Sequence, residues 1–219
     1  MSPFLVYTIP GSPYGRAVLA TLVEKEAPHE VVAVPPGSMR KEPHISRHPF
    51  GRVPVLEHDG LVLYETQAIV RYVDRAVPGK ELTPKDIRTA ARMDQIMNIN
   101  DWYLFQGVNS VIGFQRIVGP RILGLPADEA AIAAVMPNAH KVFRELARLL
   151  GSNEFFAGSQ LSLADIMVAA QLDFLSDTPE WASLTAETPN LVSWLARMNA
   201  RPSLKETTWE KVNLLARAA

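Results

Sequence analysis

The sequence predicts an α/β domain followed by an all-helical domain, and the placement of proline and glycine supports this division. Residues 1–80 hold 10 of the 17 prolines and 6 of the 12 glycines, which is typical of short strands and helices joined by tight turns. After Thr83 both residue types become sparse, and long segments with helical apolar spacing follow. We therefore expect a first domain over residues 1–79 and a second over residues 84–219.

The first half alternates apolar segments of strand length with amphipathic helices. Its expected order is β-α-β, a connecting segment with a turn of helix, and then β-β-α. Asp59-Gly60 between two apolar runs is a strong hairpin signal. A β-α-β unit followed by a hairpin gives one mixed sheet with helices packed on it. The expected strands are 4–9, 30–34, 53–57 and 61–64, and the expected helices are 13–27 and 66–76, with the turn of helix inside 38–48.

The second half is expected to consist of helices that begin at capping residues. Thr83-Pro84-Lys85-Asp86 predicts a capping box that opens a helix running to about Phe114. Asp128 opens another helix, which we expect to be interrupted near Pro137 and to end at Gly151. The remaining expected helix starts are Ser162 (with a capping box to Asp165), Thr188 and Ser203.

Composition excludes several functional classes. The 22 Lys+Arg against 23 Asp+Glu give a net charge of −1, so there is no basic excess for a nucleic-acid partner. The absence of cysteine rules out disulfides, thiolate metal sites and a cysteine nucleophile. The longest apolar runs fall short of the ~20 residues that span a bilayer, and the start lacks the basic stretch of a secretory signal. We expect a cytosolic protein without membrane contact.

The first candidate site segment is Pro10–Arg16, where a strand gives way to a helix. Ser12 lies at the expected helix start, whose unpaired N–H groups favour an anion. Its hydroxyl could add one donor, or Ser12 could act only as the helix cap. We expect Arg16, one turn later, to form a structural ion pair.

Two further segments carry polar groups or an exposed backbone. A cis bond between Val53 and Pro54 would turn the Val53 main chain outward to pair with a peptide-like ligand, whereas the alternative is a proline that only opens a strand. Thr66 can cap the next helix while its hydroxyl and nearby amides hold a carboxylate. Glu65 can accept from an ammonium group, or simply be solvated. Together, the three segments suit a small zwitterionic peptide with an anionic tip.

Four segments, in the right order and spacing, resemble the signature motifs of cytosolic glutathione S-transferases. The resemblance covers almost the whole chain. VYTIPGSPYGRAVLATLVEK is similar to the family's first strand and helix, and HPFGRVPVLEHDGLVLYETQAIVRYVD to its NPxGxVPxL…ESxAI signature. The two C-terminal signatures are matched by FFAGSQLSLADIMVA and PNLVSWLARMNARP.

The resemblance implies a thioredoxin-like N-terminal domain, an all-helical C-terminal domain and a homodimer. It implies a detoxifying transferase that joins glutathione, bound mostly by the first domain, to small hydrophobic electrophiles held by the second, with no metal. A glutathione-dependent peroxidase, dehalogenase or isomerase would use the same site. A non-catalytic glutathione-binding scaffold is the alternative from a different class.

The resemblance also assigns roles to individual residues. Ser12 matches the catalytic serine of the delta-, theta- and phi-like classes, in a member of bacterial appearance. Val53 would pair with the cysteinyl backbone of glutathione, with Pro54 cis. Glu65 and Thr66, the latter replacing the usual serine, would hold the γ-glutamyl end.

Other assignments are looser. Arg40 or Lys41 would lie near the glycyl carboxylate, and the contact of Arg52 is open. His48 replaces the family's usual asparagine. Tyr7 is the rival activator of the thiol, because other classes use a tyrosine at the end of the first strand. Tyr14 is a third candidate for the activator. The candidates for the electrophile pocket are Tyr14 and three aromatic residues on the expected long helix, Trp102, Tyr103 and Phe105, which could instead be core residues.

Overall fold

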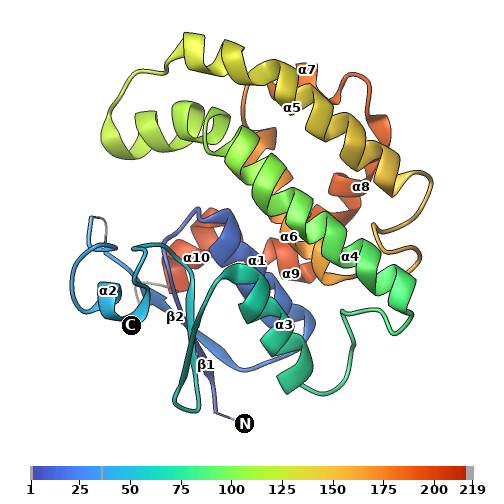
Figure 1. Cartoon of the computed structure of the whole chain (residues 1–219). Helices are drawn as coiled ribbons and strands as arrows, with labels where there is room; N and C mark the ends of the chain where they lie inside the picture. The colour runs from blue at the N-terminus through green and yellow to red at the C-terminus, as the bar shows by residue number, and fades with distance from the viewer. Residues whose placement is uncertain (1, 36, 216–219) are drawn as a thin grey trace. The chain divides into compact units, whose positions relative to one another are not determined.

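The computed structural model describes residues 2–35 and 37–215, which form two compact units (Figure 1). The first unit contains the chain up to Thr83 and the segment that follows Met198, and the second spans Pro84–Met198. No helix among the described residues is long and apolar enough to cross a membrane.

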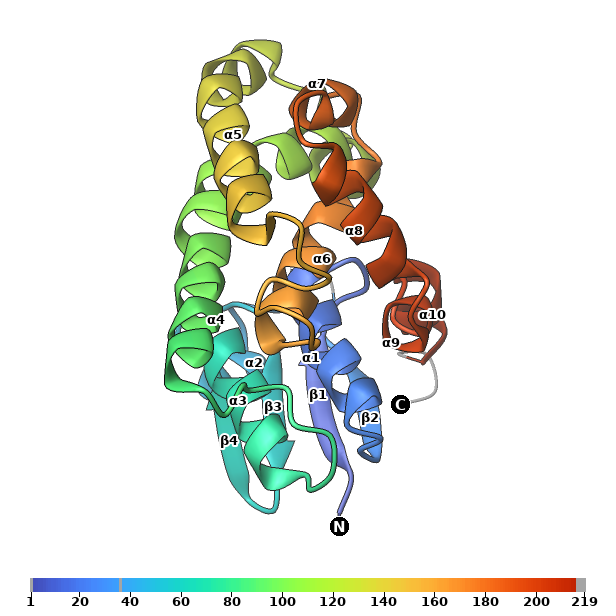
Figure 2. The same cartoon turned by 90° about the vertical axis from the view of Figure 1, so that its right-hand side faces the viewer.

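The first unit is built on a four-stranded mixed sheet, as the sequence predicted, and its strand order is β2-β1-β3-β4. β1 pairs in parallel with β2 and antiparallel with β3, and β3 pairs antiparallel with β4. Helices α1 and α3 pack against each other on one face of this sheet (Figure 2). The elements are β1 (Phe4–Thr8), α1 (Pro13–Glu24), β2 (His29–Ala33), α2 (His44–Arg47), β3 (Val55–His58), β4 (Leu61–Tyr64), α3 (Thr66–Ala76), α9 (Pro202–Lys205) and α10 (Trp209–Leu215).

The predicted hairpin is confirmed between β3 and β4. His58 pairs with Leu61, so only two residues form the turn. Asp59 and Gly60 both have positive φ, 48° and 79°, which is the backbone that a two-residue turn of this twist requires. The turn therefore fixes the register between β3 and β4.

The last part of the chain differs from the prediction of one helical domain over residues 84–219, because the segment after Met198 groups with the first unit. Glu24, at the end of α1, holds it there. Its carboxylate accepts from Arg201 at 2.7 and 2.9 Å and from Ser203 Oγ at 2.6 Å, and it pairs with Lys80. The first domain is thus assembled from both ends of the chain.

These contacts predict an acid-dependent stability. Burial alone would raise the pKa of Glu24, but hydrogen bonds from Arg201, Lys80 and Ser203 outweigh it and hold the pKa at about 2. Because this value lies below that of the unfolded chain, Glu24 stabilises the fold above about pH 4.5, and the contribution is lost as the pH falls toward 2. Wild type should therefore lose more unfolding free energy between pH 6 and pH 3 than Glu24→Gln, as measured by urea denaturation. Equal losses would show that the carboxylate does not carry this effect.

The second unit is entirely helical. Its elements are α4 (Ile87–Ile99), the π-helices η1 (Asn100–Asn109) and η2 (Phe114–Leu123), α5 (Glu129–Leu150), α6 (Leu163–Ser176), α7 (Trp181–Thr185) and α8 (Pro189–Asn199). α6 is the central element, since almost all of its residues are buried. The helix start predicted at Asp128, the helix stop at Gly151 and the capping box at Ser162 are confirmed.

Three predictions for this unit are wrong. The first helix is capped by Asp86, whose Oδ1 accepts from Thr89 N at 2.9 Å, and not by Thr83. The helical region does not end near Phe114, because a turn at residues 110–111 follows η1 and a second π-helix, η2, then extends to Leu123. α5 runs unbroken through Pro137, since a proline removes only one main-chain bond while the buried residues on either side keep the helix packed.

Candidate active site

The strand register gathers the three candidate segments at one end of the sheet. Tyr7 lies opposite Val55, and Val55 lies opposite Tyr64. The loop after β1, the residues before β3 and the turn after β4 must therefore lie side by side. This places Ser12, Val53 and Glu65 around the same edge.

Ser12 is the N-cap of α1, and its Oγ accepts a hydrogen bond from Gly15 N at 3.1 Å. The serine is half-buried and has extended φ and ψ of −73° and 115°. Because the oxygen acts as the acceptor in this cap, the hydroxyl hydrogen remains available to another acceptor. Capping and donation, which the sequence left as alternatives, are compatible in this geometry.

The start of α1 is held close to the end of β1. A Cβ on Gly15 would collide with the side chain of Thr8, which is buried. Only glycine permits this approach, so Gly15 fixes where the first turn of α1 lies. The Ser12 hydroxyl and the N-terminal amides of α1 are consequently positioned by a packed contact.

The Val53–Pro54 peptide bond is cis, as the resemblance implied. Within residues 2–35 and 37–215, the main-chain N–H and C=O of Val53 make no hydrogen bond. Pro54 is buried, whereas Val53 is half-buried. The Val53 backbone therefore offers one free donor and one free acceptor at the edge beside Ser12.

The turn after β4 places a strained residue at the start of α3. Glu65 has φ 70° and ψ 110°, and it occupies the N-cap position with an exposed side chain and no side-chain cap bond. Thr66, which was expected to cap the helix, is instead its first residue and is buried. A non-glycine residue with positive φ costs about 1–3 kcal/mol and is concentrated at functional sites.

The Tyr7 side chain contacts Glu57 and Arg47. Its hydroxyl donates to Glu57 Oε2 at 2.9 Å, and the Arg47 guanidinium lies 4.4 Å from its ring centroid. Burial raises the pKa of Tyr7, and the hydrogen bond to Glu57 raises it further. Since side chains alternate along β1, Tyr7 also lies on the opposite face of the sheet from Thr8 and α1.

The three candidate cations, Arg40, Lys41 and Arg52, are all exposed. Arg40 is tied to the loop before β3, because a Cβ on Gly51 would lie 2.7 Å from Arg40 Cγ. Gly51 has φ 61°, so both its backbone and its surroundings require glycine. Arg40 thus lies within the same loop cluster as Val53.

Two buried histidines support this cluster, and the sequence analysis gave them no role. His44 bonds to Arg52 O at 2.7 Å, and the His48 ring lies 4.8 Å from that of Tyr64. Burial lowers the pKa of His48, while the nearby charge of Glu65 acts in the opposite direction. The signal was present as His-x-x-x-His spacing in a short helical turn, which places both rings on one side of α2.

The aromatic candidates divide between the units. Tyr14 is half-buried in the first turn of α1, and the other three lie on η1. Trp102 and Tyr103 are 66% and 58% exposed, whereas Phe105 is half-buried. Core packing, the alternative for these residues, therefore does not apply to Trp102 and Tyr103.

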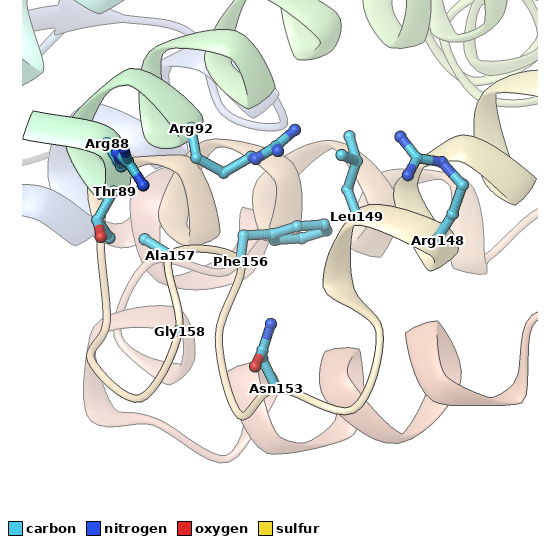
Figure 3. Close-up of a pocket in the computed structure, with 9 residues that line it drawn as sticks. All are labelled: Arg88, Thr89, Arg92, Arg148, Leu149, Asn153, Phe156, Ala157 and Gly158. Atoms are coloured by element: carbon cyan, nitrogen blue, oxygen red, sulfur yellow. The ribbon is translucent and has the colours of Figure 1, made fainter.

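The second unit contains a separate hollow of about 440 Å³ (Figure 3). It is lined mainly by α4, the end of α5 and the loop before α6, with Arg88, Arg92 and Arg148 around an apolar floor formed by Leu149 and Phe156. Arg148 is neutralised by Glu145 at 2.7 and 2.8 Å. None of its lining residues is a nucleophile or general base at neutral pH.

Comparison with known proteins identifies the family. The family described as glutathione S-transferase, N-terminal domain, matches residues 6–81, and its C-terminal domain matches residues 108–202. A glutathione S-transferase of Hyoscyamus muticus is 33% identical over 196 residues, covering 88% of this chain and 91% of the relative. The chain belongs to the glutathione S-transferase family.

Solved glutathione S-transferases share the whole fold. The apo structure of glutathione S-transferase III has a TM-score of 0.83 and 30% identity, covering 94% of this chain and 95% of that one. Glutathione S-transferase-I, bound to lactoylglutathione, has a TM-score of 0.82 and 25% identity over the full length of both chains. The predicted thioredoxin-like domain and helical domain of a glutathione S-transferase are thereby confirmed.

Proposed function

We propose that this protein is a serine-type glutathione transferase, in which Ser12 activates the glutathione thiol for attack on small hydrophobic electrophiles. The observation that carries the proposal is the arrangement at Ser12. Its oxygen accepts from Gly15 N–H, so its hydrogen is free to donate to a thiolate beside the α1 N-terminus. The hydroxyl of Tyr7, the rival activator, already donates a hydrogen bond to Glu57.

The magnitudes agree with this role. A free thiol with a pKa of about 8.5 is only about 3% ionised at pH 7, and lowering that pKa by about two units requires about 2.7 kcal/mol. One hydrogen bond to a charged group contributes about 1.5–3 kcal/mol, and a helix N-terminus adds about 0.3–1 kcal/mol. Ser12 and α1 together therefore suffice to make the thiolate the main form.

The rest of the cluster would orient the tripeptide. Val53 would exchange main-chain hydrogen bonds with the cysteinyl residue of glutathione, as an added strand does at a sheet edge. Glu65 would accept from the γ-glutamyl ammonium, and Thr66 with the α3 amides would hold its carboxylate. Arg40 or Lys41 would face the glycyl carboxylate, with Arg52 beside them.

The electrophile would be bound by the aromatic residues Tyr14, Trp102, Tyr103 and Phe105. The exposure of Trp102 and Tyr103 supports this proposal, because large exposed aromatics commonly mark interaction sites. Chemistry then needs only an electrophile held beside the sulfur, since proximity supplies much of the rate. We also propose that the protein acts as a cytosolic homodimer.

Two measurements test the proposed function together. The protein should be retained on glutathione-agarose and should catalyse the reaction of glutathione with a chloronitrobenzene. Retention without turnover of this substrate or of a hydroperoxide would instead support a glutathione-binding scaffold. Turnover of a hydroperoxide alone would reassign the same thiolate to peroxidase chemistry.

A substitution at Glu65 tests the binding pose. Glu65→Gln should weaken glutathione binding by roughly ten- to a hundredfold, since one charge-assisted bond to the ammonium contributes about 1.5–3 kcal/mol. The turnover number at saturating glutathione should change much less. Asp59→Asn, which removes an exposed carboxylate at the far hairpin turn, is the control. Unchanged affinity in Glu65→Gln would exclude an ammonium contact at this carboxylate, and calorimetry measures both variants.

A further inference from the structure

The segment over residues 199–215, here called the C-terminal segment, runs along α1 toward the loop that carries Ser12. Glu24 binds its first residues through Arg201 and Ser203. Arg16 Nη2 donates to Leu204 O at 3.0 Å, one turn from Ser12. Thr207 Oγ1 then bonds to Ser203 O at 2.6 Å and joins α9 to the start of α10.

The C-terminal segment contacts Gly11 through the side chain of Trp209. Trp209, the first residue of α10, places Cδ2, Cε3 and Cζ3 of its ring in the space that a Cβ on Gly11 would occupy. Gly11 has φ 79°, and it directly precedes Ser12. Glycine is therefore required here twice, by the backbone conformation and by the ring that lies on it.

The helix that carries Trp209, α10, packs against the first unit. Val212 is 3% exposed, and α10 contacts β2 of the same sheet. On the other side of the helix, Leu214 is 63% exposed. The half-buried Trp209 thus connects the packed side of α10 to the loop between β1 and α1.

We propose that Trp209 is a positioning residue, which holds Gly11 and thereby aims the Ser12 hydroxyl at the thiolate. Glycine is the residue with the greatest backbone freedom, and its rotation would swing the next residue. The Ser12 amide bonds to Ile9 O at 3.2 Å, which fixes the turn but leaves the outer face of Gly11 to be covered by the indole. This inference rests on the proposed role of Ser12.

The consequence concerns the reaction more than the fold. An error of about 1 Å in a catalytic group can cost about a hundredfold in rate. Loss of the ring should therefore lower kcat and raise the pKa of the bound thiol, while the remote contacts of glutathione keep its KM nearly constant. A residue that served stability alone would change the amount of folded enzyme but not the thiol pKa.

The experiment compares Trp209→Ala with Trp209→Phe, and uses Leu214→Ala on the same helix as the control. The readouts are kcat, the KM for glutathione, and the pH dependence of thiolate absorbance in the ultraviolet. We expect Trp209→Ala to lose roughly tenfold or more in kcat and to raise the thiol pKa toward the value in Ser12→Ala. Trp209→Phe should retain most of both properties, and Leu214→Ala should match wild type.

A double-mutant cycle tests the contact itself. Gly11→Ala adds the Cβ that meets the indole, so it should reduce kcat strongly in the wild-type background. In Trp209→Ala the space is open, and the same change should cost less, leaving only the strain of alanine at positive φ. If Gly11→Ala lowered kcat by the same factor in both backgrounds, the Trp209 ring and the Gly11 loop would not be coupled.

The inference is overturned if Trp209→Ala keeps the wild-type thiol pKa and the wild-type kcat per folded molecule. If that variant does not fold, Trp209→Leu, which keeps apolar volume without a flat ring, is judged by the same two readouts. Ser12→Ala separates the two proposals. An unchanged thiol pKa there would remove the proposed function, whereas a raised pKa there with none in the Trp209 variants would remove only this inference.

Discussion

Replacing Ser12 by alanine should lower the rate of glutathione conjugation by roughly ten- to a hundredfold. The variant loses one hydrogen bond to a charged sulfur, which contributes about 1.5–3 kcal/mol, and about 1.36 kcal/mol corresponds to one pKa unit. The pKa of the bound thiol should therefore rise by about one to two units. Glutathione affinity should stay within several-fold, because the other contacts of the tripeptide are untouched.

The measurement is a pH profile of kcat/KM with a chloronitrobenzene, together with calorimetry for glutathione. Alanine also removes the cap on α1, where Ser12 accepts from Gly15 N, so stability should fall by about 1 kcal/mol. Ser12→Thr is the matched control, because it keeps both the hydroxyl and the cap. A wild-type rate in Ser12→Ala would reject the assignment and direct attention to Tyr7.

Replacing Asp165 by alanine should have the largest effect on stability. This carboxylate is fully buried. Oδ1 accepts from Phe156 N at 2.8 Å and Trp194 Nε1 at 3.2 Å, and Oδ2 accepts from Ser162 N at 3.0 Å and Ser162 Oγ at 2.7 Å. Alanine would leave these donors unpaired in the core, at a cost of about 3–5 kcal/mol.

Such a loss is a large part of the 5–15 kcal/mol that stabilises an ordinary domain. Urea denaturation measures it, with Asp128→Ala as the control. Asp128 also caps a helix, accepting from Ala131 N at 3.0 Å, but it is exposed, so its loss should cost only about 1 kcal/mol. Similar costs for both variants would mean that the buried network around Asp165 is not what stabilises the second unit.

The sequence predicted the first half of the chain closely, because each element there is bounded by its own turn residues. Asp59-Gly60 fixed the hairpin, and α3 begins and ends at the predicted residues, Thr66 and Ala76. Helix caps were predicted correctly at Ser12, Asp128 and Ser162, but not at α3, where Glu65 takes the N-cap position and Thr66 is the first helical residue. At Thr83–Asp86 two candidates compete, and Asp86 wins because its carboxylate reaches the Thr89 amide.

Features that depend on long-range contacts could not be predicted. The π-helices η1 and η2 have no local signature in the sequence, and Pro137 is tolerated because of packing around α5. At the candidate site, Ser12, Val53 and Glu65 were proposed from local motifs, whereas the hydrogen bond from Tyr7 to Glu57 depends on the pairing of β1 with β3. The contact between Trp209 and Gly11 joins residues almost 200 positions apart.

The return of the chain to its first unit has a consequence for biosynthesis. In sequence, the second unit is an insertion within the first, whose closing residues emerge from the ribosome only after the second unit. The nascent thioredoxin-like sheet must therefore wait, with Glu24 unsatisfied by Arg201 and Ser203, until the C-terminal segment has been synthesised, although N-terminal domains commonly fold first during synthesis. A fragment that ends at Thr83 should accordingly emerge as an aggregation-prone intermediate.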